Sequence, residues 1–239
     1  MKLLDAAASR TLKFGSIFLA AVALTACGGG GNPALGSVSG TAAIGAPLAN
    51  ASIQLACKNG SGSAAANANG AYSAAFNFDG PCAITASSGA VTIHSFAAGT
   101  GTYNVTPLTQ LLLSYLAGQL GTTVDGLLAG ITSNASYQSA LTNPTIIANA
   151  QAGVAQLLKT MYGITLSSSS FLTVSFIPGQ PGADADLETL RAAGAITSDG
   201  QPAASLAAAA VSAGAASPIA GSGSNGATGG TGGTGTTTK

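Results

Sequence analysis

The sequence of 239 residues contains seven Lys and Arg and seven Asp and Glu, so charged side chains make up only 6% of it and the formal net charge is zero. A chain with so few basic residues lacks the Lys and Arg clusters that neutralise phosphates, which argues against a nucleic-acid partner. Trp is absent and aromatic residues make up 5% of the chain. Any core must therefore be built mainly from Ala, Val, Ile and Leu, with modest buried area per residue.

Residues 1–26 have the features of a secretory signal peptide. Lys2, Arg10 and Lys13 form a basic start, and an apolar run follows over Phe14–Leu24. This run is too short to cross a bilayer as a helix, which takes about 20 apolar residues. A basic start, a short apolar stretch and small residues together are typical of a signal peptide rather than of a folded element.

The motif Leu24-Thr25-Ala26-Cys27 resembles the lipobox of bacterial lipoproteins. The resemblance implies cleavage before Cys27, lipidation of this residue by diacylglycerol and usually a third acyl chain such as palmitate, and a flexible tether over residues 27–34. Each buried methylene stabilises membrane binding by about 0.8 kcal/mol, so several chains give a firm membrane anchor. Gly28 is not aspartate, which by the sorting rule of enteric lipoproteins implies the outer membrane of a Gram-negative cell envelope. The alternative is a plain secreted protein in which Cys27 is incidental.

Cys57 and Cys82 are left as an even pair once Cys27 carries lipid. In an oxidising compartment such a pair predicts a disulfide. The bond would close a loop of roughly 25 residues and contribute about 3 kcal/mol. A zinc or redox site is the rival interpretation, but the chain has no C-x-x-C spacing and only one histidine. We expect no metal and no cofactor.

Residues 35–105 show the period-two alternation of β-strands. The pattern predicts an antiparallel β-sandwich, with turns at Gly, Asn, Ser and Pro. Cys57 and Cys82 fall on the same strand faces as the apolar residues, as a buried disulfide between strands requires. The alternating apolar positions are Ile53, Leu55 and Cys57; Tyr72, Ala74, Phe76 and Phe78; Cys82, Ile84 and Ala86; and Val91 and Ile93.

Two segments of this region resemble the carboxypeptidase regulatory-like, transthyretin-type β-sandwich. They are GAPLANASI at 45–53 and ANGAY at 68–72. Pro47 fixes φ in a turn, and Asn69-Gly70 suits the positive φ of a hairpin. The resemblance implies an Ig-like or prealbumin-like sandwich that serves as an accessory binding module rather than as a catalyst. The chain departs from the family in lacking an acidic residue before the Asn-Gly turn and in adding the cysteine pair.

Two helix starts are marked by a hydroxyl or amide residue followed by proline. Thr106-Pro107 begins an apolar stripe that ends near Gly121, and Asn143-Pro144 begins another that ends at Gly163. A side-chain oxygen at the N-cap and proline at the first helical position favour helix initiation. Together with the sandwich, the T-P-L-T-x-L start is similar to a class of uncharacterised proteobacterial lipoproteins, a resemblance that carries no known activity.

Shorter elements fill the rest of a helical subdomain over residues 106–200. We expect helices over 124–131 and 135–141, a strand over Phe171–Ile177, and a helix whose first turn is capped by Asp184 and Asp186. From residue 201 the chain is mostly Ala, Gly, Ser and Thr. Residues 201–239 are therefore predicted to be a low-complexity, largely disordered tail. The fold class that follows is α+β, an N-terminal β-sandwich followed by a small helical subdomain.

No set of residues has the pattern of a catalytic site. His94 is the only histidine, and its position beside Ile93 predicts a strand residue that faces solvent. The acidic cluster Asp184-x-Asp186-x-Glu188 is a weak calcium candidate, because it lacks the EF-hand pattern. The sequence thus favours a non-enzymatic envelope lipoprotein that acts as a structural, adhesion or accessory binding module, with an unknown envelope partner. Two alternatives stay open: a solute-binding lipoprotein with an apolar pocket between sandwich and helices, lined in part by Tyr115, and a hydrolase that uses His94.

Overall fold

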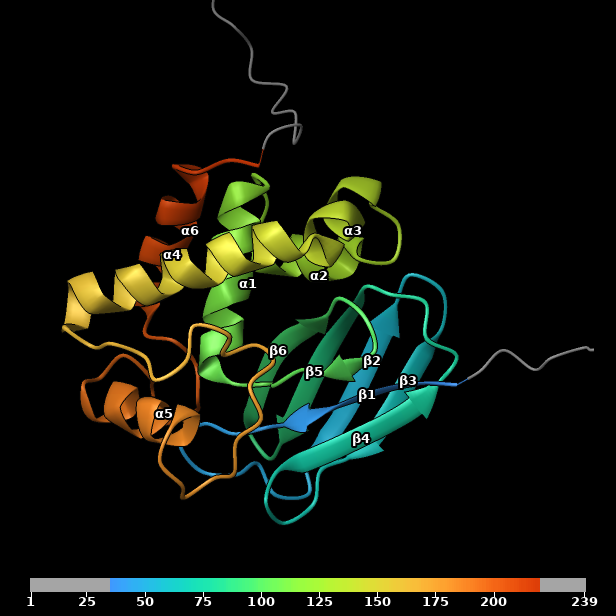
Figure 1. The fold of residues 1–239 in the computed structure, drawn as a ribbon, viewed down its shortest axis with the longest axis horizontal. Coiled ribbons are helices and arrows are strands. Elements are labelled where there is room, and N and C mark those ends of the chain that lie inside the picture. Colours follow the sequence, from blue (N-terminus) through green and yellow to red (C-terminus); the bar gives the residue numbers. More distant parts are fainter. Residues whose placement is uncertain (1–34, 220–239) are drawn as a thin grey trace, which may run out of the picture. The chain divides into compact units, whose positions relative to one another are not determined.

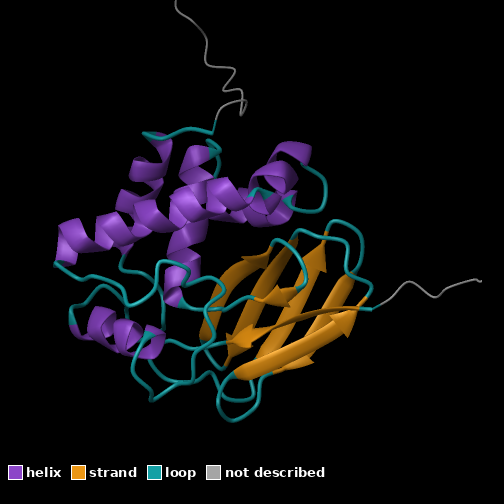
Figure 2. Ribbon diagram, in the orientation of Figure 1, coloured by secondary structure: helices purple, strands orange, loops and turns teal. Residues whose placement is uncertain are grey.

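The computed structural model describes residues 35–219, in which seven strands are followed by six helices (Figure 1). The helices gather on one side of the strands (Figure 2). This order confirms the expected mixed α+β class. The strands are β1 Gly36–Thr41, β2 Ser52–Cys57, β3 Ser61–Ala65, β4 Ala71–Phe76, β5 Cys82–Ser88, β6 Val91–Ala97 and β7 Gly101–Thr102. The helices are α1 Pro107–Gln119, α2 Val124–Gly130, α3 Ala135–Thr142, α4 Pro144–Tyr162, α5 Ala183–Ala192 and α6 Ala204–Ala215.

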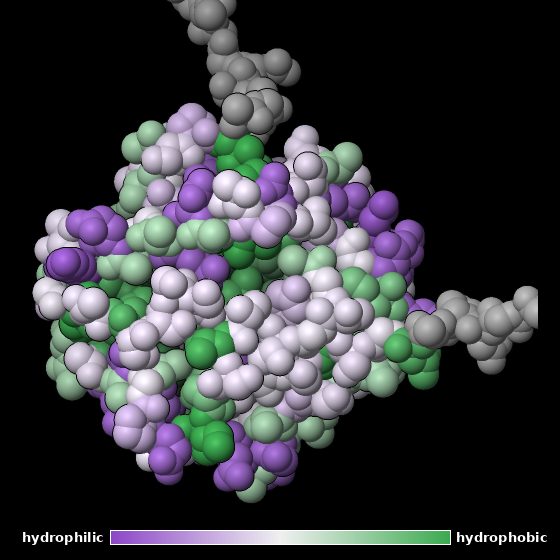
Figure 3. All heavy atoms as spheres, viewed as in Figure 1, coloured by the Kyte–Doolittle hydropathy of each residue, from purple (hydrophilic) through white to green (hydrophobic). Residues whose placement is uncertain are grey.

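The strands form two sheets, of order β3-β2-β5-β6 and β4-β1-β7. All pairs are antiparallel except β1 with β7. Along β2 the buried residues are Ile53, Leu55 and Cys57, and along β4 every second residue is likewise buried. The alternation predicted from the sequence is confirmed. The outward residues of β1 and β4 are mostly Ser, Ala and Gly, so the surface over these strands is pale in Figure 3, neither strongly hydrophilic nor hydrophobic.

Helix α1 packs against β6, the strand at one edge of the four-stranded sheet. Its N-cap, Thr106, and Thr109 form a reciprocal capping box. At the edge strand β6, the backbone N–H of His94 donates to Oε1 of Gln110 over 2.7 Å, and its carbonyl accepts from Oγ1 of Thr109 over 3.3 Å. Further along the edge, the carbonyl of Thr92 accepts from a side-chain amide of residue 201 over 2.6 Å. These bonds satisfy backbone groups that would otherwise leave the edge open to another strand.

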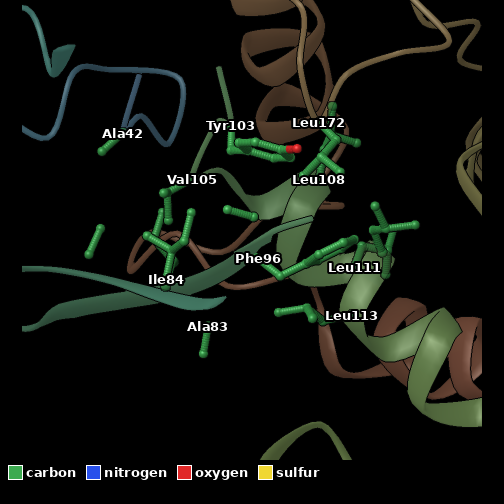
Figure 4. Packing of buried hydrophobic residues seen from close by; sticks show 14 of the residues in the cluster. Ala42, Ala83, Ile84, Phe96, Tyr103, Val105, Leu108, Leu111, Leu113 and Leu172 are labelled. Carbon is green, nitrogen blue, oxygen red and sulfur yellow. The ribbon is translucent and has the colours of Figure 1, made fainter. Parts of the chain in front are cut away.

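The body of α1 is the centre of the helical half. Every residue of this helix except Gln110 is buried, which is typical of a helix surrounded on all sides by protein. Phe96 points from β6 toward Leu111 of α1 (Figure 4), and both side chains are almost fully buried. The sandwich and the helical half therefore share one apolar core.

Helix α6 corrects the prediction of a largely disordered tail from residue 201. Residues Ala204–Ala215 are helical, and Leu206 and Ala210 are buried. The reason is a close backbone contact with α1. A Cβ atom added at Gly214 would lie 2.0 Å from the Tyr115 carbonyl oxygen, and one added at Gly118 would lie 2.1 Å from that of Val211. Small residues permit this approach, so a helix with few large side chains still packs. Residues 220–239 lie outside the described residues, as do the predicted signal peptide and tether.

The expected strand over Phe171–Ile177 is wrong, because this segment is irregular. Its backbone groups bond instead to Asn104, which is fully buried. The Asn104 side-chain amide donates to the carbonyls of Phe171 and Val174 over 3.2 and 2.7 Å. Its backbone N–H donates to the Leu172 carbonyl over 2.7 Å. A single buried amide thus replaces the neighbouring strand that a β-segment would need.

The other predicted helices are confirmed. The side chain of Asn143 caps α4 through the N–H groups of Thr145 and Ile146, and α4 ends at Gly163 in the left-handed conformation, with φ of 70°. This conformation is one that glycine adopts without steric cost, so the residue ends the helix cleanly. Helices α2 and α3 lie within a residue of their predicted bounds. No helix within residues 35–219 is long and apolar enough to cross a membrane.

Candidate functional site

Cys57 and Cys82 stand directly opposite each other on β2 and β5. The structure joins them in a disulfide with an S–S distance of 2.04 Å, as the sequence predicted. Both residues are buried inside the sandwich, at 2% and 0% exposure. Their sulfur atoms are therefore held in the disulfide and are not available as metal ligands or nucleophiles. Cys27, the predicted site of lipidation, lies outside the described residues.

Within residues 35–219, no group of three or more His, Cys, Asp or Glu side chains has an arrangement that could hold a metal ion. The acidic cluster at α5 has another role. Asp184 accepts a hydrogen bond from the backbone N–H of Gly179 over 2.7 Å, and Asp186 accepts from the N–H and hydroxyl of Ser167 over 2.9 and 2.7 Å.

The expected capping of α5 by its own acidic residues is therefore wrong. The residue before the helix is Gly182, and no side chain caps the first turn. The two carboxylates lie in that turn, where the helix dipole favours negative charge, but each fastens a neighbouring loop to the helix. One oxygen of Asp184, Oδ1, is buried with no partner among the described atoms.

His94 lies on the opposite face of β6 from Ile93, as predicted, but it is half-buried rather than facing solvent. The correction follows from the packing of α1 against β6, which the alternation of β6 cannot reveal. The strand register places Thr85 of β5 opposite, and its hydroxyl lies 3.0 Å from Nδ1 of the imidazole. Burial lowers the pKa of His94 below its usual value, and the charge of Asp125 in α2 opposes this shift.

Thr85, His94 and Asp125 are thus brought near one another, a grouping that only the strand register and the position of α2 reveal. The arrangement sets the imidazole beside a hydroxyl, and burial disfavours its charged form. Neither this imidazole nor its partners line the groove described next, which is where the structure offers space for a ligand.

A groove of about 600 Å³ lies between α1, α4 and the segment that follows α6. We call it the α1–α4 groove; it is lined by Tyr115, Gln119, Ile146, Asn149, Ser217, Pro218 and Ile219. Its volume is within the 300–1,000 Å³ range of small-molecule sites. Tyr115 is among the lining residues, and every lining residue belongs to the helical half. The α1–α4 groove is therefore a different place from the pocket between sandwich and helices that the alternative interpretation of the sequence assigned to Tyr115.

Gln119 builds one wall of the α1–α4 groove. The side-chain amide of Gln119 donates to the backbone carbonyl of Ser217 over 2.9 Å. The backbone carbonyl of Gln119 accepts from the backbone N–H of Ile219 over 3.3 Å. These two bonds hold the segment after α6 against the end of α1. The groove is thus formed by fixed backbone on two sides, which favours binding because less ordering is needed.

Two other hollows in the helical half are less suited to a ligand. One is a cavity of about 10 Å³ with a wholly apolar lining that includes Leu111, Leu158 and Leu206. It has room for about one water molecule but offers no polar partner. The other is a groove of about 240 Å³ between α4 and the segment of residues 165–169.

Comparison with known proteins adds no further constraint. No protein-family model, no curated protein and no solved structure matches this chain. The lipobox and the regulatory-like sandwich remain resemblances drawn from the sequence.

Proposed function

We propose that this chain is a lipid-anchored lipoprotein of the bacterial cell envelope that acts as a non-enzymatic binding module. The proposed anchor is Cys27, at the end of the lipobox-like motif that follows the apolar run. Gly28 at the next position supports the outer membrane as the destination. The partner of the module would be another component of the envelope.

The disulfide is the observation that carries this proposal. Disulfides between buried strand residues persist in oxidising compartments and are rare in the cytosol. The pairing of Cys57 with Cys82 leaves Cys27 as the third cysteine of the chain. An odd cysteine in an exported protein calls for its own explanation, and lipidation supplies one that agrees with its position.

Two turns of the sandwich support the proposed resemblance of residues 35–105 to the carboxypeptidase regulatory-like module. The segment of residues 45–53 leads into β2, with Gly45 at φ of 85° and Asn50 at φ of 56°. The turn at Asn69-Gly70 leads into β4, with Gly70 at φ of 76°. Both motifs lie at turns that lead into strands, which supports the proposed resemblance. An Ig-like or prealbumin-like fold of this kind is a common carrier of binding surfaces, and function then depends on the attached site.

Intact mass spectrometry of the protein extracted from bacterial membranes tests the proposal. We expect a mass that begins at Cys27 and includes acyl chains, and an increase of two hydrogens on reduction. The variant Cys27→Ser is the matched control and should lose the acyl mass while keeping the disulfide. An unacylated wild-type chain would overturn the anchor and the location that depends on it.

A further inference from the structure

None of the described residues that line the α1–α4 groove is charged. An ion placed there would lose hydration without gaining a partner of opposite charge, which is costly. The charge pattern therefore selects a neutral ligand. It disfavours carboxylates, phosphates and ammonium groups alike.

Unused hydrogen-bonding groups line this groove. Tyr115 is only 7% exposed, and its hydroxyl, which lies beside Gly153 of α4, makes no hydrogen bond with any residue in the described part of the chain. The side-chain amide of Asn149 and the hydroxyl of Ser217 are exposed and make no hydrogen bond with another described residue, so both can reach a bound ligand. A mostly buried polar group without a partner is rare in proteins, so the Tyr115 hydroxyl points to a ligand that supplies one.

The remaining lining is apolar. Ile146 on α4 and Pro218 and Ile219 on the opposite wall form hydrocarbon surfaces. Recognition of an extended peptide commonly uses an open strand edge or an aromatic-lined groove. Neither is available here, because the walls are helices and a fixed segment and the single aromatic side chain is mostly buried. A flexible aliphatic chain needs no such backbone partner.

We propose that the α1–α4 groove binds an uncharged amphiphile, an aliphatic chain that carries an amide or alcohol group. The chain packs against Ile146, Pro218 and Ile219, and the head group bonds to Asn149 and the Tyr115 hydroxyl. This inference deepens the proposed binding function by naming the class of ligand. It does not depend on the lipid anchor.

Calorimetric titration of the full-length Cys27→Ser chain, which carries no acyl chain that could compete for the groove, tests the proposal. The probes are octanamide and octanoate, which share one hydrocarbon chain and differ in head-group charge. We expect saturable binding of octanamide and at least tenfold weaker binding of octanoate. Asn149→Leu should weaken octanamide binding at least fivefold, because an amide loses its partner. Ala148→Leu, at the exposed neighbouring position on α4, is the control and should leave binding unchanged.

Equal affinity for the two probes would overturn the charge argument, and no saturable binding of octanamide would overturn the proposal. A third outcome, nuclear Overhauser contacts between Ile146 and residues 220–239 in place of ligand binding, would assign the groove to the chain's own C-terminal segment and also overturn it. Failure of acylation in the mass spectrum would overturn only the lipoprotein proposal, so the two tests can fail separately.

Discussion

Replacement of Gly214 by alanine tests the contact between α1 and α6 directly. Helix propensity alone predicts that Gly→Ala inside a helix raises stability by about 1 kcal/mol. The structure predicts the opposite sign. The added Cβ would lie 2.0 Å from the Tyr115 carbonyl oxygen, far inside the roughly 3.3 Å of a normal carbon–oxygen contact.

The magnitude follows from the two ways in which the protein can respond. Overpacking against a backbone that cannot rotate away costs about 3 kcal/mol, the upper end of the usual range. If α6 detaches instead, the loss includes the buried Leu206 side chain, which contributes about 1.5–3 kcal/mol. With the gain in propensity subtracted, we expect Gly214→Ala to lower the free energy of unfolding by about 2 kcal/mol.

Urea denaturation followed by far-ultraviolet circular dichroism measures this change, and the slope of the transition reports whether α6 is lost from the cooperative unit. Ser212→Ala, on the exposed side of the same helix, is the control and should stay within about 0.5 kcal/mol of the parent chain. A Gly214→Ala variant as stable as the parent, or more so, would refute the close approach of the two backbones. The composition of residues 204–215 would then again predict a disordered segment.

Three further substitutions test other parts of the core. Ser95→Ala should raise the free energy of unfolding by about 1 kcal/mol, because the hydroxyl is fully buried without a partner; a loss in thermal denaturation would show that the hydroxyl has one. Asn104→Ala should lower the free energy of unfolding measured in urea by about 3 kcal/mol, since it leaves buried backbone groups of Thr41 and Phe171 unpaired, and a loss under 1 kcal/mol would contradict the bridging role. Burial lowers the pKa of His94 from 6.5, so below that pH the unfolded chain binds the proton more readily and stability falls. His94→Gln should reduce the stability difference between pH 8 and pH 5, and an unchanged difference would speak against this account.

The sequence by itself determined the elements whose signals are local. The alternation of Ile53, Leu55 and Cys57 fixes which face of β2 is buried, because successive side chains of a strand point to opposite sides. Thr106 and Pro107 fix the start of α1, because the cap and the restricted φ act within one turn. The pairing of Cys57 with Cys82 was predicted from the even pair that remains once Cys27 carries lipid, and the strand parity agreed with it.

Only the tertiary structure decided the elements whose bonding partners are distant. Strands β1 and β3, with sequences GSVSGT and SGSAA, have too few large apolar residues to show an alternation, and pairing with neighbouring strands places them in the sheets. The sequence of residues 171–177 predicts a strand. In the structure their carbonyls accept hydrogen bonds from Asn104, which lies 67 residues before Phe171 in the chain. Helix α6 depends on Gly118, which lies far from it in the sequence.

The candidate site divides in the same way. The sequence offered Tyr115 only as a lining residue of a pocket between sandwich and helices, not of this groove. Asn149 and Ser217 had no signal, because a polar residue on a helix or after one has the same local pattern whether or not it lines a groove. The groove exists because Gln119 holds the segment after α6 against α1 through bonds that span 98 residues and more. No local sequence pattern records such a contact, since its free energy depends on packing that forms only when the helices meet.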